Sequence, residues 1–286
     1  MSNTLKLISI LKIIGLLVLV ALVVFLAFVW FLMRPMLFFN ESQIPRDLIT
    51  SQFIDFDRVY MISAFRSGAG HDFSSGVIGE TCRSMKHYFN TSKFNASGDS
   101  QQGPYRSQPK ASEPNIKIYA PFDGRIIEID DSHTGVGVKI SPDKHSSFLV
   151  RIDHVDLLPE FKFGTHVKSG QWIATIGPRD GVDFSVEATT LNKGNILLSY
   201  FEVMTDEVFK PYKDLGFQRE DFIISKEYRD AHPFKCGGVQ IHPLNKLEET
   251  FQHAKTRSQT EDYIYLKADP YPQPGWPEVH IGPPKR

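Results

Sequence analysis

The residues with the clearest chemical potential lie in a glycine-rich turn. This turn, RSGAGHDFSS (residues 66–75), sets His71 beside Asp72 after an apolar run. Imidazole and carboxylate groups are ligands for divalent cations, so the turn is a candidate rim of a metal-dependent active site.

The same residues also have a structural interpretation. Aspartates in glycine-rich turns commonly accept hydrogen bonds from backbone N–H groups, so Asp72 can be a turn residue with a structural role alone. Other reactive pairs are weaker candidates. The serines near His71 lack a Gly-x-Ser-x-Gly elbow. Cys82 and His87 are five positions apart, but a disulfide or a buried thiol explains Cys82 better than a thiol–imidazole pair does.

Short β-like segments have to position these side chains. They recur roughly every 8–12 residues between Gly or Pro turns, a spacing typical of an all-β sandwich or barrel. Residues 80–89 suit either a short helix or an extended arm, and helical patterns occur at 206–215 and 244–254. The predicted strands span residues 57–65, 116–121, 125–129, 135–140, 147–154, 171–176, 182–187 and 195–204.

An apolar N-terminal segment precedes this β-rich part. Residues 13–33 contain no charged side chain over 21 positions, which matches the roughly 20 residues of a membrane-spanning helix. The length of this segment favours an uncleaved signal-anchor over a secretory signal, whose core is shorter. Lys6 and Lys12 precede it, so we expect a cytoplasmic N-terminus and an extracytoplasmic, periplasmic main domain of a single-pass membrane protein.

The chain is therefore divided into four parts. Residues 1–35 are the cytoplasmic stub and transmembrane signal-anchor, and 36–56 a juxtamembrane linker. Residues 57–210 are the exported β-domain, with a loop insertion at 91–115, and 211–286 are a C-terminal extension of mixed structure with a Pro-rich tail. A formal charge of −1 provides no basic surplus for nucleic acid. The two cysteines, Cys82 and Cys236, are compatible with one disulfide or with two unrelated buried thiols.

One series of motifs resembles a known family. The order YAPFDGRIIEI, GVGVKI, FLVRIDHV and GTHVKSGQWIATIG resembles the duplicated hybrid motif that lysostaphin-type zinc endopeptidases share with biotinyl and lipoyl carrier domains. The resemblance covers about residues 60–190 and implies a peptidase-like β-sandwich. The carrier branch is disfavoured because no turn with a modifiable lysine stands between the matched strands. The matched positions are Ala120-Pro121, Asp123-Gly124, His154, Gly164, Val167 and Gly170-Gln171.

The resemblance also implies a metal site, and this sequence departs from it. In that family, zinc is held by the His and Asp of His-x-Gly-x-Asp and by the last His of His-x-His, and a further His assists a metal-bound water. Asp72 matches the first aspartate, but Gly68 stands at the first histidine and His71 is out of register. Asp183 matches the last ligand and His154 the assisting histidine. The implied metal ligands are Asp72, Asp183 and His154, a hard set that suits Ca²⁺ or Mn²⁺ as well as Zn²⁺. The structural alternative makes Asp72 and Asp183 turn residues bonded to backbone N–H groups, and His154 a rim histidine with its polar atoms satisfied.

The depleted ligand set shapes the expected function. The first hypothesis is a catalytically inactive pseudoenzyme, anchored in the membrane, that binds or scaffolds at the cell envelope and contacts peptidoglycan or an envelope protein. The alternative is a metallohydrolase that cleaves cell-wall or envelope peptides at an atypical Asp/His/Asp site, with His71 as base or ligand. A third hypothesis makes residues 211–286 the interaction surface and the β-domain a spacer.

Overall fold

The structure is a computed structural model of the whole chain. It describes residues 3–37, 44–74, 77, 79–91, 116–132, 135–177, 181–190, 194–237, 240–242, 263–267 and 281–283. The predicted insertion at 91–115, the helical pattern at 244–254 and the Pro-rich tail lie mostly outside the described residues, so these three stay predictions.

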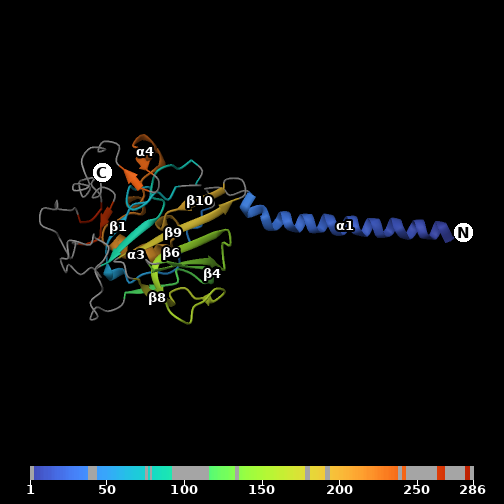
Figure 1. Ribbon diagram of the computed structural model, residues 1–286, viewed down its shortest axis with the longest axis horizontal. Helices are drawn as coiled ribbons and strands as arrows, with labels where there is room; N and C mark the ends of the chain where they lie inside the picture. The colour runs from blue at the N-terminus through green and yellow to red at the C-terminus, as the bar shows by residue number, and fades with distance from the viewer. Residues whose placement is uncertain are drawn as a thin grey trace.

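Helix α1 (Asn3–Leu37) projects from the β-rich body as one long rod (Figure 1). Its segment Lys12–Trp30 is long and apolar enough to cross a membrane, and none of that segment is buried inside the protein. A signal sequence near an N-terminus has the same length and composition. The permanence of the anchor and its orientation therefore stay predictions.

The body is built on antiparallel β-structure. Within the described residues, hydrogen bonds connect eleven strands in one branched sheet of order β13-β1-β2-β9-β6-β5-β4-β7, with β10 beside β9 and β8 between β3 and β6. A separate pair, β11 (Lys235–Gly237) and β12 (Gln240–His242), lies in the predicted extension. The mainly β fold class with an N-terminal helix is confirmed. The strands of the large sheet are β1 (Val59–Ser63), β2 (His87–Thr91), β3 (Lys117–Tyr119), β4 (Gly124–Ser132), β5 (Gly135–Pro142), β6 (Phe148–Leu157), β7 (His166–Val167), β8 (Trp172–Ile176), β9 (Gly181–Thr190), β10 (Gly194–Leu198) and β13 (Tyr263–Tyr265).

Alternation along the central strands separates a core face from a polar face. In β9, Val182, Phe184 and Val186 are fully buried in the hydrophobic core, whereas the intervening Asp183 and Ser185 point to the opposite face. The neighbouring strands β2 and β6 continue the same core face, with Phe89, Val150 and Ile152. The sheet thus has one apolar side that stabilises the fold and one polar side that remains for chemistry.

One predicted strand is wrong in its second half. The segment 195–204 was expected to be a single strand, but it is β10 followed by helix α2 (Tyr200–Val203). Ser199 and Glu202 form a capping box: Ser199 Oγ accepts from the Phe201 N–H, and Glu202 accepts from the Ser199 N–H. These side chains satisfy N–H groups that have no partner within a helix, so the helix begins here despite the β-forming residues around it.

Segments on both sides of the predicted β-domain contribute to its core. Ile49 and Phe53, from the predicted linker, are fully buried, as are Tyr212 and Phe222, from the predicted extension. The helical prediction at 206–215 is confirmed. The short helical elements are η2 (Phe56–Arg58), α3 (Asp206–Asp214), η3 (Arg219–Phe222) and α4 (Lys226–Ala231).

Candidate functional site

The polar face of the sheet gathers side chains from three neighbouring strands. Tyr88 in β2 is opposite Asp183 in β9, which is opposite Asp153 in β6. Ser185 and Arg151 are opposed in the same way and form the adjacent row. Directly opposed residues of antiparallel strands point to the same face, so all five side chains share one surface.

His154 reaches this face through a β-bulge in β6. Two valines of β5 that are two positions apart pair with Ile152 and Val155, so Asp153 and His154 together oppose a single residue of β5. His154 has a φ of 69°, a left-handed conformation that re-aims its side chain. Gly177 closes the bulge. Its N–H donates to the His154 carbonyl at 2.8 Å, and a Cβ at this glycine would come within 2.6 Å of that oxygen.

The centre of the polar face is the carboxylate of Asp183. Its Oδ2 accepts a hydrogen bond from Lys86 Nζ at 2.6 Å and lies 3.3 Å from His154 Nε2. The side chains of Lys86 and Asp183 are each 7% exposed. Burial acts to raise the pKa of Asp183, but the hydrogen bond with His154 and the charge of Lys86 outweigh burial, so the pKa lies below its ordinary value. The carboxylate is therefore ionised, and a lysine inside the protein neutralises it.

Two aromatic rings complete the surroundings of Lys86. Its ammonium lies 4.7 Å from the ring centre of Phe73 and 5.1 Å from that of Tyr88, within the range of cation–π attraction. The Tyr88 hydroxyl accepts a hydrogen bond from the His71 N–H at 3.0 Å. A Cβ at Gly70 would come within 2.1 Å of the Tyr88 ring, so glycine is required where the turn packs on this tyrosine. The glycine-rich turn thus packs beside Lys86.

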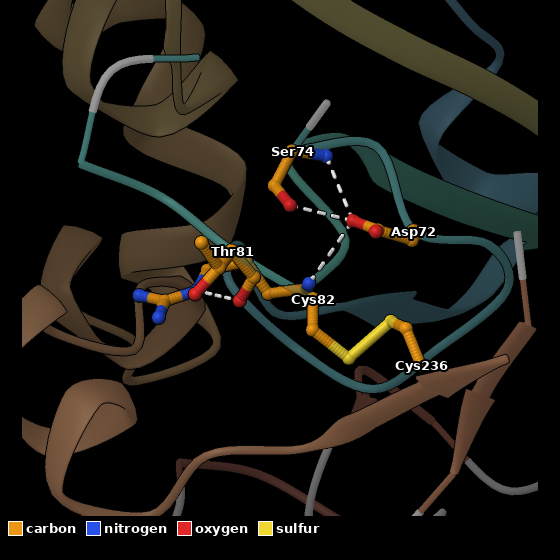
Figure 2. Close-up of a disulfide and its surroundings, with 6 residues drawn as sticks. Asp72, Ser74, Thr81, Cys82 and Cys236 are labelled. Atoms are coloured by element: carbon orange, nitrogen blue, oxygen red, sulfur yellow. Dashed lines mark hydrogen bonds between the residues drawn. A yellow bond between two sulfur atoms is a disulfide. The ribbon is translucent and has the colours of Figure 1, made fainter. Parts of the chain in front are cut away.

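Asp72 belongs to the turn itself. Its Oδ1 accepts hydrogen bonds from the Ser74 N–H at 3.0 Å, the Ser74 hydroxyl at 2.6 Å and the Arg83 N–H at 3.2 Å (Figure 2). These three donors fold residues 72–74 back on the segment that follows Cys82. These contacts give Asp72 a structural role in the turn, which is one of the two roles that the sequence left open for it.

These donors do not fit the metal site that the family resemblance implies. In the part of the chain that the structure describes, no three His, Cys, Asp or Glu side chains come together as potential ligands. Asp183 and His154 are adjacent, but Asp72 does not form a group of three with them, and its Oδ1 accepts hydrogen bonds from Ser74 and Arg83 instead. The third group at Asp183 is the ammonium of Lys86, which has only donors and cannot coordinate a cation.

Lys86 is the site residue that sequence reasoning missed. The signal for it was the alternation in KHYFN (residues 86–90). If His87 and Phe89 face the core, Lys86 and Tyr88 must face the polar side. That inference requires an extended conformation, and the sequence left residues 80–89 between helix and extended arm.

His87, which the sequence offered as a weak partner for Cys82, points into the core. Its Nδ1 lies 2.8 Å from the Ser63 carbonyl oxygen, and its Nε2 lies 2.8 Å from Ser199 Oγ. Because a carbonyl only accepts, Nδ1 carries the proton and Nε2 accepts from the Ser199 hydroxyl. Burial is the main reason that the pKa of His87 falls to about 4.

We expect this histidine to make the fold sensitive to acid. The pKa returns to about 6.5 in the unfolded chain, so between about pH 6.5 and pH 4 the unfolded state binds a proton that the folded state does not bind. The contribution of neutral His87 to the free energy of unfolding is fully present above this pH range and declines by up to about 3 kcal/mol as the pH falls through it. His87→Gln should flatten the pH dependence of the free energy of unfolding in denaturant titrations. An unchanged slope would argue against a buried neutral His87.

A second charged network ties the glycine-rich turn to α4. The side chain of Arg83 is 2% exposed and lies 2.7 Å from both Glu80 and Asp230 of α4, and Arg66 joins Glu80 at 2.9 Å. Next to this network, Cys82 and Cys236 form a disulfide (Figure 2). Of the two alternatives for the cysteines, the bridge is confirmed.

Comparison with known proteins finds similarity only among solved structures, since no family model and no curated protein matches the chain. The chain is similar to a zinc containing peptidase from Vibrio cholerae, with 18% identity over 53% of this chain and 39% of that one and a TM-score of 0.33. Csd3 from Helicobacter pylori has 17% identity over 53% and 33%, with a TM-score of 0.33. The catalytic domain of lysostaphin from Staphylococcus simulans has 14% identity over 48% and 88%, with a TM-score of 0.31. The chain thus spans about two fifths and one third of the first two proteins.

Proposed function

We propose that this chain is a membrane-anchored pseudoenzyme, a peptidase-like module that binds or scaffolds at the cell envelope without hydrolysing its partner. One observation carries the proposal: the carboxylate of Asp183 is already bonded to Lys86 Nζ at 2.6 Å. The ammonium already holds Asp183 Oδ2, so a metal at that oxygen would have to displace it, and a lysine held as an ammonium is not a base. Hydrolysis by a metal-bound water needs both an open metal position and free ligands.

The residues around this carboxylate form a surface that suits binding. Tyr88, Arg151 and Asp153 are half-buried, so each keeps part of its surface in contact with solvent. Arg151 forms ion pairs with Asp153 at 2.7 Å, Asp130 at 3.0 Å and Glu128 at 3.2 Å, which gather three carboxylates around one guanidinium. Ordered aromatic and arginine side chains are the usual anchors of recognition surfaces. We propose peptidoglycan or an envelope protein as the partner.

An extracytoplasmic position of the β-domain agrees with two features. The apolar segment Lys12–Trp30 supports membrane anchoring, and the Cys82–Cys236 disulfide is of the kind that persists in oxidising compartments. We propose a cytoplasmic N-terminus with the β-domain on the outer side of the membrane.

The proposal predicts a protein that binds without a metal. Full-length protein in detergent micelles should contain no stoichiometric zinc, calcium or manganese before or after chelator treatment. It should leave purified peptidoglycan uncleaved and should co-sediment with it or capture an envelope protein. Elemental analysis, a muropeptide release assay and sedimentation measure these three properties.

Two outcomes would favour the rival functions. A stoichiometric metal and peptide hydrolysis, both lost in Asp72→Ala and Asp183→Ala, would establish the metallohydrolase. Arg151→Glu should weaken partner capture if the polar face binds. Capture that survives this substitution but is lost on deleting residues 268–286 would place the interaction on the extension.

A further inference from the structure

The charge at the centre of the polar face has an unusual source. Lys86 Nζ and His154 Nε2 approach the same oxygen, Asp183 Oδ2, at 2.6 and 3.3 Å. An ionised carboxylate that is 7% exposed requires a positive partner, because burial without one is strongly unfavourable. At this oxygen the ammonium supplies the positive charge that a divalent cation supplies in a metal site.

We propose that Lys86 is an internal substitute for a metal cation, and that it occupies the position at which one further ligand would complete a zinc site with Asp183 and His154. The inference rests on the proposed function, since it treats the Asp183 cluster as structural in the native protein. The cation–π contacts of Phe73 and Tyr88 hold the ammonium in place without ligating a metal. The fold therefore keeps two metal donors assembled around a lysine.

The strand register explains why a single substitution at position 86 should complete a zinc site. Extending the β2–β9 pairing by one residue places Lys86 opposite Ser185, which makes Asp183 its diagonal neighbour. Diagonal neighbours lie about 7–8 Å apart, and zinc binds imidazole nitrogen and carboxylate oxygen at about 2 Å, so shorter side chains can meet at one ion. Lys86→His removes the ammonium and adds a third donor beside Asp183 and His154. Two imidazoles and one carboxylate with an open fourth position are a zinc ligand set.

Zinc titration of the full-length protein in micelles tests this proposal. Wild type should show no saturable zinc binding, whereas Lys86→His should bind one zinc ion per chain and gain Tm on adding zinc. Lys86→Gln is the matched control, because it removes the charge and keeps a hydrogen-bond donor but offers no good zinc ligand. Lys86→His combined with Asp183→Asn should lose the binding again. Lys86→Cys, a second variant with a zinc ligand at this position, should behave like Lys86→His.

The outcomes separate this inference from the proposed function. Zinc binding by wild type would show that the ammonium does not replace the cation, and binding by Lys86→Gln as tightly as by Lys86→His would show that no ligand is missing at position 86; either result would overturn the inference. So would the absence of binding in both Lys86→His and Lys86→Cys, including failure of both to fold with zinc present. If wild type binds no metal and neither variant does, only this inference fails. If the variants bind zinc but wild type captures no envelope partner, only the proposed function fails.

Discussion

Replacing both bridged cysteines, Cys82→Ser together with Cys236→Ser, is expected to lower the Tm of the full-length protein by about 10–20 °C. The bridge joins residues that are 154 positions apart. Closing a loop of that length restricts the unfolded chain and stabilises the folded state by about 5 kcal/mol. The effect is large because the restriction falls on more than half of the chain.

The variant should nevertheless fold, because other bonds join the part of the chain that precedes and includes the Cys82 region to the part that leads to Cys236. The Phe65 N–H donates to the Phe222 carbonyl at 2.9 Å, and the Ile224 N–H donates to the Phe65 carbonyl at 3.0 Å. Arg83 bonds Asp230 at 2.7 Å across the same contact. The disulfide therefore closes a contact that backbone and ion pairs already form, and its loss should change stability more than structure.

Reduced wild-type protein is the matched control for this prediction. It should melt at the same temperature as the double serine variant, and oxidised wild type should melt well above both. Thermal unfolding followed by near-ultraviolet circular dichroism measures the three values. If oxidised wild type and the variant had equal Tm, the bridge would contribute nothing to stability in solution.

The strand pattern and half of the site were predictable from the sequence because both depend on local alternation. Segments such as GVGVKI and FLVRI alternate with period two between Gly or Pro turns, which specifies strands without knowledge of their partners. His154 and Asp183 lie on neighbouring strands of the β-rich part, and the structure brings them within 3.3 Å. The β-bulge that turns His154 onto the polar face depends on a register shift, which the pattern of one strand does not contain.

The other half of the site was not predictable because it depends on long-range pairing. Asp72 follows the family motif in spacing, but its carboxylate is used by donors in its own turn and in the segment after Cys82. Lys86 reaches Asp183, 97 positions away, only because β2 pairs with β9. No local sequence pattern predicts which two strands will pair with each other. Lys86 lies inside a segment whose conformation the sequence left undecided, so its alternation with His87 and Phe89 could not be linked to a distant carboxylate.

Removing the charge of Lys86 is the second substitution with a large expected effect. Lys86→Met conserves most of the side-chain volume but leaves Asp183 buried without its positive partner, and breaking a buried pair on one side costs about 3–5 kcal/mol. The free energy of unfolding at neutral pH should fall by that amount in denaturant titrations. Lys86→Met combined with Asp183→Asn should recover much of the loss, because the second substitution removes the buried charge itself.

The pH dependence distinguishes loss of charge from loss of packing. In wild type the pKa of Asp183 is below its ordinary value, so its contribution to stability is present above that ordinary value and declines as the pH falls through the folded value. In Lys86→Met, burial acts with less opposition and raises the pKa of Asp183, so acid neutralises the buried charge while the protein is folded. The deficit of Lys86→Met relative to wild type should therefore shrink as the pH falls from 7 towards about 4. A deficit that is independent of pH and is not reduced by Asp183→Asn would mean that Lys86 stabilises the fold by packing. The proposal that Lys86 serves as an internal cation would then have to be abandoned.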